Sequence, residues 1–332
     1  MPLLEVQNLS VRLPTQRGPA DAVRGVSFNL ERGETLGLIG ESGCGKSITA
    51  LSLMGLLPER SVVSGSIRFE QQELVGLDDA ALQRLRGNRI GMIFQEPMTA
   101  LNPVHTIGHQ VAEPLRLHRG ASAKGARQQA IALLDRVGIA DAARRVDAYP
   151  HQFSGGQRQR ITIAMALACG PDLLIADEPT TALDVTIQGQ ILDLISDLVQ
   201  ERGMALLLIS HDLGVIAQNA SRMLVMYGGT VVESGPASAV FADMAHPYTR
   251  GLFGARPQLG AARGTRLTTI VGSVPELIDL PAGCPFFERC PLAIAECAST
   301  RPAPSELGQS HQASCLRLDA VSAATATTGD TP

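Results

Sequence analysis

A glycine-rich loop spans residues 40–47 and reads Gly-Glu-Ser-Gly-Cys-Gly-Lys-Ser, which fits the G-x-x-x-x-G-K-S/T pattern. The loop follows the apolar run Leu36–Ile39 and precedes the helical run Ile48–Leu57, the strand–loop–helix context that the pattern requires. Backbone N–H groups of such a loop converge on phosphate oxygens, and the dipole of the following helix favours negative charge. The sequence therefore predicts an α/β fold with a P-loop nucleotide site.

The residues of this loop have expected roles at the phosphates. The ammonium of Lys46 is expected to contact the β- and γ-phosphates, and the Ser47 hydroxyl to ligate Mg²⁺. Lys46 is one of only two lysines among 28 basic residues, and a compact ammonium fits between phosphates where a planar guanidinium would not. The predicted phosphate site consists of Gly40, Glu41, Ser42, Gly43, Cys44, Gly45, Lys46, Ser47 and Ile48.

Three apolar runs with the length of buried parallel strands end in polar residues. These runs are Leu36–Ile39 before the phosphate loop, Leu173–Ala176 before Asp177-Glu178, and Leu206–Ile209 before Ser210-His211-Asp212. Ligands lie beyond the carboxyl ends of the strands in open α/β sheets, so the three ends predict one site. Helical patterns at Ile161–Ala168 and Val185–Gln200 intervene, and Gly228-Gly229 indicates a hairpin within 222–235.

A second motif lies more than a hundred residues downstream of the loop. Ser154-Gly155-Gly156-Gln157 precedes a helical run, and Asp177-Glu178 and then Ala182-Leu183-Asp184 follow it. Together with the phosphate loop, this order resembles the ATP-binding-cassette (ABC) ATPase family. The resemblance implies a P-loop NTPase core with an antiparallel β subdomain and a helical insertion. It also implies an enzyme that binds ATP and Mg²⁺ and works as a dimer.

The resemblance assigns roles to single residues. Asp177 matches the Walker B aspartate that holds Mg²⁺, and Glu178 the carboxylate that polarises the attacking water. Gln95 matches the Q-loop glutamine, which contacts Mg²⁺ or that water, and His211 the histidine at the γ-phosphate. The residues implied to act across a dimer interface are Ser154, Gly155, Gly156 and Gln157, which face the partner's ATP, and Asp184 of the D-loop.

Two positions depart from the family pattern. Family members usually stack adenine on an aromatic residue near the start of the chain, but residues 11–15 read Val-Arg-Leu-Pro-Thr. Contact with adenine is therefore expected to be apolar, through Leu13 or Val23. Ile48 stands where many members have a hydroxyl residue, and its backbone N–H can still reach the α-phosphate.

Four of the six cysteines, Cys284, Cys290, Cys297 and Cys315, are spaced C-x5-C-x6-C-x17-C. In a cytoplasmic protein, clustered cysteines favour a metal over disulfides. Zinc sites usually have closer cysteine pairs, whereas iron–sulfur clusters accept varied spacings. A zinc knuckle and four free thiols remain open alternatives. Cys44 and Cys169 are expected to be small packed residues.

Further segments resemble one branch of the family, the oligopeptide/dipeptide importers. They are 95–103 (Gln-Glu-Pro-Met-Thr-Ala-Leu-Asn-Pro), 149–152, 246–249 and 283–291 around the first two clustered cysteines. In that branch the four cysteines are associated with a [4Fe–4S] cluster. The resemblance also implies a second ATPase subunit or a second copy of this chain, two transmembrane permeases, and a periplasmic or extracellular substrate-binding protein. Related ATPases serve importers of glutathione or nickel chelates, so the cargo stays open.

Domain boundaries follow from the same reading. An ABC ATPase domain is expected over 1–250, with its core at 1–95 and 166–250 and a helical subdomain at 96–165. A cysteine-containing extension at 251–318 and a disordered Ala/Thr/Ser-rich tail at 319–332 follow.

Charge and hydropathy limit where the chain acts. The formal charge of −4 gives no reason to expect nucleic-acid binding. No apolar run has the roughly 18 residues of a membrane helix, and no secretory signal is evident. We expect a peripheral protein at the cytoplasmic face of the inner membrane. Two rivals, a soluble ABC protein of DNA repair or translation and a P-loop kinase, fit less well. The first typically has coiled-coil insertions or two cassettes, and the second lacks the 154–157 motif.

Overall fold

The computed structural model describes residues 1–181, 183–255 and 269–321. A large mixed sheet forms its centre, with strand order β11-β12-β10-β9-β3-β8-β7-β6. Five neighbouring strands are parallel: β9 (Arg222–Tyr227), β3 (Thr35–Ile39), β8 (Ala205–Ser210), β7 (Leu173–Asp177) and β6 (Ile90–Ile93). Their side chains are almost entirely buried, as expected for parallel strands covered on both faces. The three strands predicted from apolar runs are therefore confirmed.

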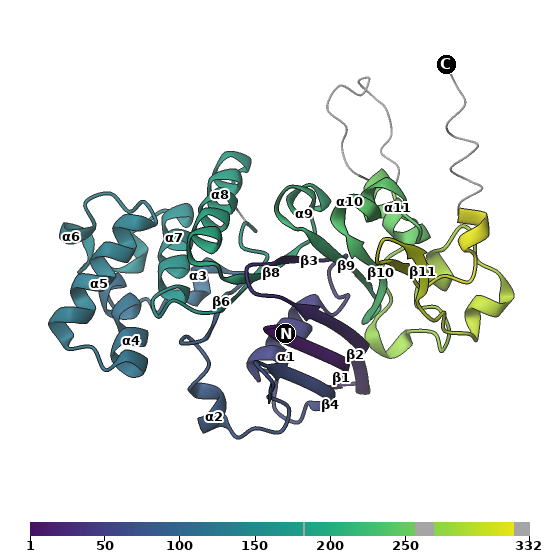
Figure 1. Ribbon diagram of the computed structural model, residues 1–332, viewed down its shortest axis with the longest axis horizontal. Coiled ribbons are helices and arrows are strands. Elements are labelled where there is room, and N and C mark those ends of the chain that lie inside the picture. Colours follow the sequence, from purple (N-terminus) through teal and green to yellow (C-terminus); the bar gives the residue numbers. More distant parts are fainter. Residues whose placement is uncertain (182, 256–268, 322–332) are drawn as a thin grey trace, which may run out of the picture.

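Helix α8 (Val185–Arg202) connects β7 to β8, and α9 (Leu213–Asn219) connects β8 to β9. Helix α1 (Lys46–Met54) follows β3, whereas α10 (Ala237–Ala242) and α11 (Pro247–Gly254) come later in the chain, near β9 and β10 (Figure 1). The short helix α2 (Asp79–Gln83) precedes β6 and lies away from the large sheet (Figure 1). Helix α1 stops at Gly55, which has a left-handed backbone and caps the helix, so it is shorter than the predicted run to Leu57. Asp184 is the N-cap of helix α8, and its side chain accepts the backbone N–H of Ile187.

A separate antiparallel sheet packs beside the core, below it in Figure 1, with strand order β2-β1-β4-β5. Its strands are β2 (Gly18–Leu30), β1 (Leu4–Thr15), β4 (Val62–Phe69) and β5 (Gln72–Glu73). Apolar residues on its inner face, including Leu4, Val11 and Leu30, are fully buried. This sheet is the antiparallel β subdomain that the family resemblance implies.

A helical unit occupies one end of the molecule in Figure 1. It contains α3 (Pro97–Ala100), α4 (Ile107–Arg119), α5 (Ala123–Arg136), α6 (Ala142–Arg145), the 3-10 turn η1 (Pro150–Gln152) and α7 (Gly155–Ala166). Helix α4 packs against α5 and α7, and α7 also packs against β6 and α8 of the core. Helix α7 therefore joins the predicted helical insertion to the central sheet.

The C-terminal part lies at the opposite end from the helical unit (Figure 1). The Gly228-Gly229 turn joins β9 to β10 (Thr230–Pro236) as the predicted hairpin, and β12 (His311–Ala313) and β11 (Ser305–Gly308) extend the sheet. Short turns η2 (Leu277–Asp279), η3 (Phe287–Arg289) and η4 (Ala295–Ala298) fill the rest. Val321 is buried, so packed structure continues past the predicted start of the tail at 319, whereas 322–332 lie outside the described residues.

Candidate functional site: the phosphate loop and the strand ends around it

The phosphate loop connects β3 to α1, which begins at Lys46. Gly43 and Gly45 both have left-handed backbone, with φ of 83° and 98°. A Cβ atom on Gly45 would lie 2.6 Å from the Ala22 carbonyl oxygen, whereas the space around Gly43 is open. Glycine is therefore required at Gly45 for conformation and for space, and at Gly43 for conformation alone.

Lys46 is 5% exposed, and its ammonium points back into the loop. Its Nζ donates to the carbonyl oxygens of Gly40, at 2.8 Å, and of Glu41, at 3.1 Å. The same nitrogen lies 3.8 Å from Oε1 of Glu178. The cation thus stands within a ring of acceptors at the place where the sequence predicts phosphate oxygens.

Asp177 ends β7 and is 4% exposed. Burial raises the pKa of its carboxyl group, and a hydrogen bond with the Ser47 side chain opposes that shift. Its Oδ1 atom is buried without a hydrogen-bond partner in the described part of the chain. A buried carboxylate oxygen with a free lone pair, next to a serine hydroxyl, is an oxygen donor set suited to Mg²⁺. Ser47 and Asp177, two of the three residues predicted at Mg²⁺, are therefore in contact, whereas the third, Gln95, donates to Glu178.

The side chain of Glu178, the next residue, has three polar partners at this edge of the sheet. Its Oε2 accepts from Gln95 Nε2 at 3.2 Å and from Thr181 Oγ1 at 3.0 Å, and lies 3.1 Å from His211 Nδ1. These contacts, led by the one with His211, lower the pKa of Glu178 to about 2. The structure thus joins the three predicted catalytic residues, Gln95, Glu178 and His211, in one cluster.

The backbone of Glu178 has φ of 47°, in the left-handed region that residues other than glycine rarely adopt. Its N–H donates to the Ile209 carbonyl of β8 at 3.0 Å, which fixes the turn after β7. Such a conformation costs about 1–3 kcal/mol and persists where surrounding contacts determine it. The two adjacent carboxylates therefore have different partners. Glu178 lies beside Lys46, whereas Asp177 contacts Ser47.

The C-terminal part supplies residues that sequence reasoning missed. Arg289 is 5% exposed at its side chain and forms a bidentate ion pair with Glu41, with Nη1–Oε2 at 2.6 Å and Nη2–Oε1 at 3.0 Å. The Tyr248 hydroxyl accepts the Glu41 backbone N–H at 2.8 Å. The phosphate loop is therefore held by contacts from α11 and from the cysteine-containing extension, and no local pattern around Arg289 indicates this.

Ser154 caps helix α7 and forms a capping box with Gln157. The Ser154 hydroxyl accepts the Gln157 N–H, and the Gln157 amide oxygen accepts the Ser154 N–H. Ser154 is exposed and no hydrogen bond joins this turn to Lys46, Ser47 or Glu178 within the part of the chain described. The predicted signature turn is thus presented outward, while Ala182 of the neighbouring motif lies outside the described residues.

The predicted adenine contacts differ in accessibility. Val23 is fully buried in the antiparallel sheet and cannot contact a base, so this expectation is wrong. Leu13 is half-buried near the end of β1 and remains available.

The four clustered cysteines are all free thiols in the C-terminal part. Burial first, and then the charges of the other three thiols, raise the pKa of Cys284 to about 11. Cys290 and Cys315 also have raised pKa values, with burial the main cause. The four thiols are thus neighbours. Even so, no three His, Cys, Asp or Glu side chains among residues 1–181, 183–255 and 269–321 stand close enough to hold a metal ion.

Three features define a P-loop ATPase of the ABC class. They are the phosphate loop at the end of central strand β3, the Asp177-Glu178 pair at the end of β7, two strands away, and the helix α7 capped by Ser154. Comparison with protein families agrees: the family described as "ABC transporter" matches residues 23–181, and "Oligopeptide/dipeptide transporter, C-terminal region" matches residues 232–297. The chain belongs to the ATP-binding proteins of ABC transporters, in their oligopeptide/dipeptide branch.

Individual relatives cover nearly the whole chain. A putative peptide import ATP-binding protein of Brucella melitensis is 50% identical over 97% of this chain and 99% of its own length. The dipeptide transport ATP-binding protein DppD of Bacillus subtilis is 50% identical over 96% of this chain and 95% of its own. The oligopeptide transport ATP-binding protein OppD of Mycobacterium tuberculosis is also 50% identical, but the chain spans only 52% of that relative's length.

Solved structures show the same fold. A dimeric ATP-binding cassette in a post-hydrolysis state with ADP and Pi has a TM-score of 0.63 and 29% identity, covering 70% of this chain and 98% of the other. In the described residues, no helix combines the length and the apolar character needed to cross a membrane.

Proposed function

We propose that this chain hydrolyses ATP and couples the hydrolysis to import of di- and oligopeptides. The observation that carries the proposal is the position of the Glu178 carboxylate. It stands 3.8 Å from the Lys46 ammonium and is held by Gln95, Thr181 and His211. A carboxylate fixed beside the phosphate-binding lysine can orient a water molecule for attack on the γ-phosphate.

ATP loading requires a rearrangement at Lys46. Its ammonium now donates to the Gly40 and Glu41 carbonyls, and these hydrogen bonds would be exchanged for contacts with phosphate oxygens. Ser47 and the free Oδ1 of Asp177 would hold Mg²⁺, which neutralises charge on the phosphates when bound. Glu178, with a pKa of about 2, stays ionised, and Gln95 and His211 keep it aimed at the attacking water.

The active form in this proposal is a dimer of cassettes. Ser154 is exposed and Gly155–Gln157 are half-buried. Among the residues described they have no hydrogen bond to the chain's own Lys46 or Glu178, so they are available to a second subunit's ATP. The related cassette solved with ADP and Pi is dimeric. The second subunit would be a related ATPase or another copy of this chain, with Asp184 at the interface.

The remaining partners follow from the branch. Two transmembrane permeases would receive the movement of the helical unit α3–α7, and a periplasmic or extracellular substrate-binding protein would deliver the peptide. The chain would then act as a peripheral protein at the cytoplasmic face of the membrane. With a formal charge of −4, it is not proposed to bind nucleic acid. Glutathione or a nickel chelate is the alternative cargo.

The test is a Glu178→Gln variant, studied alone and with its paired subunit. ATP hydrolysis should fall at least ~100-fold, the scale of a lost catalytic carboxylate. ATP should still bind and should now hold the cassettes together as a stable dimer by light scattering. Glu59→Gln, at an exposed glutamate, is the matched control and should hydrolyse ATP normally. A Glu178→Gln protein that stays monomeric with ATP in both settings would refute the transporter mechanism.

We also propose that Cys284, Cys290, Cys297 and Cys315 hold a [4Fe–4S] cluster. Four free, neighbouring thiols support it as a donor set. Their present spacing does not hold a metal ion, so binding would draw the thiols closer together. Anaerobically purified protein should contain about four iron per chain and absorb near ~400 nm, and Cys290→Ser should lose both. Zinc, or no metal, would refute the cluster and leave the ATPase proposal intact.

A further inference from the structure

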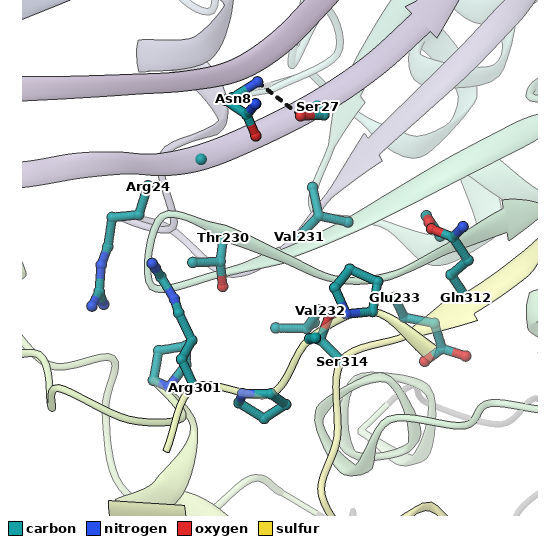
Figure 2. A pocket seen from close by; sticks show the side chains of 16 residues that line it. Asn8, Arg24, Ser27, Thr230, Val231, Val232, Glu233, Arg301, Gln312 and Ser314 are labelled. Atoms are coloured by element: carbon teal, nitrogen blue, oxygen red, sulfur yellow. Dashed lines mark hydrogen bonds between the residues drawn. The ribbon is translucent and has the colours of Figure 1, made fainter. Parts of the chain in front are cut away.

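A cavity of about 450 Å³ lies between the antiparallel sheet and the C-terminal part, and its lining includes no residue of the phosphate loop. Strand β2 forms one wall with Arg24 and Ser27, β10 forms the floor, and the segment before β11 forms the opposite wall with Arg301. Figure 2 shows the Arg24 and Arg301 side chains on the same side of this cavity, with Glu233 on the other. None of these residues belongs to the nucleotide site.

The positive charge of this cavity is not matched by nearby carboxylates. Asp21 is the carboxylate that acts on both Arg24 and Arg301. It is already engaged by Arg12, whose Nε and Nη2 donate to its two oxygens at 2.7 and 3.4 Å. Three guanidinium groups therefore share one carboxylate.

Glu233 lines the cavity, but its carboxylate is hydrogen-bonded to other residues. Its carboxylate is fully buried and accepts the backbone N–H groups of Ala245, at 2.7 Å, and His246, at 2.9 Å. It also lies 2.8 Å from Nε2 of His311. Within the described residues, the ion-pair partner of Glu233 is His311, and neither arginine forms an ion pair with this carboxylate.

Arg24 bears the clearest sign of a missing partner. Its Nη1 atom is buried and has no hydrogen-bond acceptor among residues 1–181, 183–255 and 269–321. Burial and the positive charge of Arg301 lower the pKa of Arg24, and burial lowers that of Arg301. Leaving a buried charged donor unsatisfied is costly, and two like charges add repulsion, so both features are explained if the cavity accepts an anion.

We propose that this cavity binds the carboxylate or phosphate group of a small molecule between Arg24 and Arg301. Planar guanidinium groups recognise both oxyanions through paired hydrogen bonds. Ser27 accepts the Asn8 N–H at 2.8 Å, which leaves its hydroxyl proton for a further acceptor. Val231, Pro302 and Pro304 form an apolar part of the wall, suited to an apolar group on the same ligand.

The site is tested by titrating full-length protein with inorganic phosphate and, separately, with butanoate, by calorimetry and by thermal melting. The wild type should bind at least one of the two and melt at higher temperature in its presence. Arg24→Gln and Arg301→Gln should each weaken that binding about tenfold or more, the scale of one lost charge-assisted contact. Tighter binding of phosphate would indicate a phosphorylated ligand, and tighter binding of butanoate would indicate a carboxylate.

Arg84→Gln is the matched control, because it removes the same charge from an exposed position that does not line the cavity. It should bind like the wild type. If the phosphate binds at the cavity, Arg301→Gln should lose the binding and Lys46→Ala should keep it. If it binds at the nucleotide site, the two variants should show the reverse. That reversal, or a wild type that binds neither probe, would overturn the proposal. The result does not depend on transport activity.

Discussion

Arg289 forms a bidentate ion pair with the carboxylate of Glu41, at 2.6 and 3.0 Å, and so joins the cysteine-containing extension to the phosphate loop. The next residue along the chain is Cys290. The Tyr227 hydroxyl lies 3.3 Å from the same guanidinium. The conformation of the phosphate loop is therefore tied to the packing of a segment that lies outside the ATPase core in sequence.

Arg289→Gln should destabilise the fold and weaken ATP binding. Removing Arg289 leaves Glu41 without its cation, and because Glu41 is 29% exposed at its side chain we expect a loss of about 2 kcal/mol, below that of a fully buried pair. Denaturant unfolding and ATP titration measure the two effects. The Arg289→Gln/Glu41→Gln double variant should lose less than the sum of the single variants. Additive losses would show that the pair is not coupled.

Glycine substitutions in the phosphate loop should separate backbone conformation from crowding. Gly43→Ala meets open space at φ of 83° and should cost about 1 kcal/mol. Gly45→Ala has a similar φ of 98° but places Cβ at 2.6 Å from the Ala22 carbonyl oxygen, so it should cost about 2 kcal/mol or more. Thermal unfolding of the two variants side by side gives the comparison. Equal losses would contradict the predicted clash.

The His211–Glu178 contact predicts a pH dependence. The partner carboxylate raises the pKa of His211 above its ordinary 6.5, so its contribution to stability is complete below that value and is lost as pH rises through the raised pKa. The pKa of Glu178 is lowered from 4.5 to about 2, so its contribution is present above 4.5 and is lost as pH falls towards 2. The pair contributes most between these limits.

NMR titration of the His211 ring checks this directly. The ring should titrate above 6.5 in the wild type and at lower pH in Glu178→Gln, since burial then acts without the carboxylate. A His211 pKa that does not move in the variant would show that the contact is absent in solution.

Asp177→Asn should remove the dependence of ATP binding on Mg²⁺. The substitution keeps the size of the side chain but takes away the negative charge next to Ser47. ATP affinity with Mg²⁺ should fall by about tenfold, towards the value without the ion. Asp193→Asn, at an exposed position on α8, is the control. Unchanged Mg²⁺ dependence in Asp177→Asn would remove this residue from the proposed metal site.

The sequence predicted the parts of the site that local patterns encode. The phosphate loop, Asp177-Glu178 and His211 each follow an apolar strand, and parallel pairing of those strands brings them together. The sequence also predicted a helix after Ser154–Gln157, and the structure begins α7 at Gly155. Such motifs need few long-range contacts to take shape, which explains why they could be recognised.

Contacts between distant segments were not predictable. The Arg289–Glu41 pair, the Tyr248 hydroxyl at the Glu41 N–H, and the Arg24–Arg301 cavity all depend on how the C-terminal part docks on the core. An arginine or tyrosine is common on any surface, so nothing in the local sequence marks these residues. The burial of Val23, which excludes contact with adenine, likewise follows from sheet packing.

Glu41 and Arg289 lie 248 residues apart, and this separation has a consequence for biosynthesis. At about 5–20 residues per second, a ribosome needs roughly 12 to 50 seconds to make the intervening chain. During that interval the phosphate loop has emerged but its brace has not been translated. A truncated or stalled product would therefore contain the whole phosphate-loop sequence without Arg289, which holds the loop in place. Full nucleotide affinity would arise only once translation nears its end.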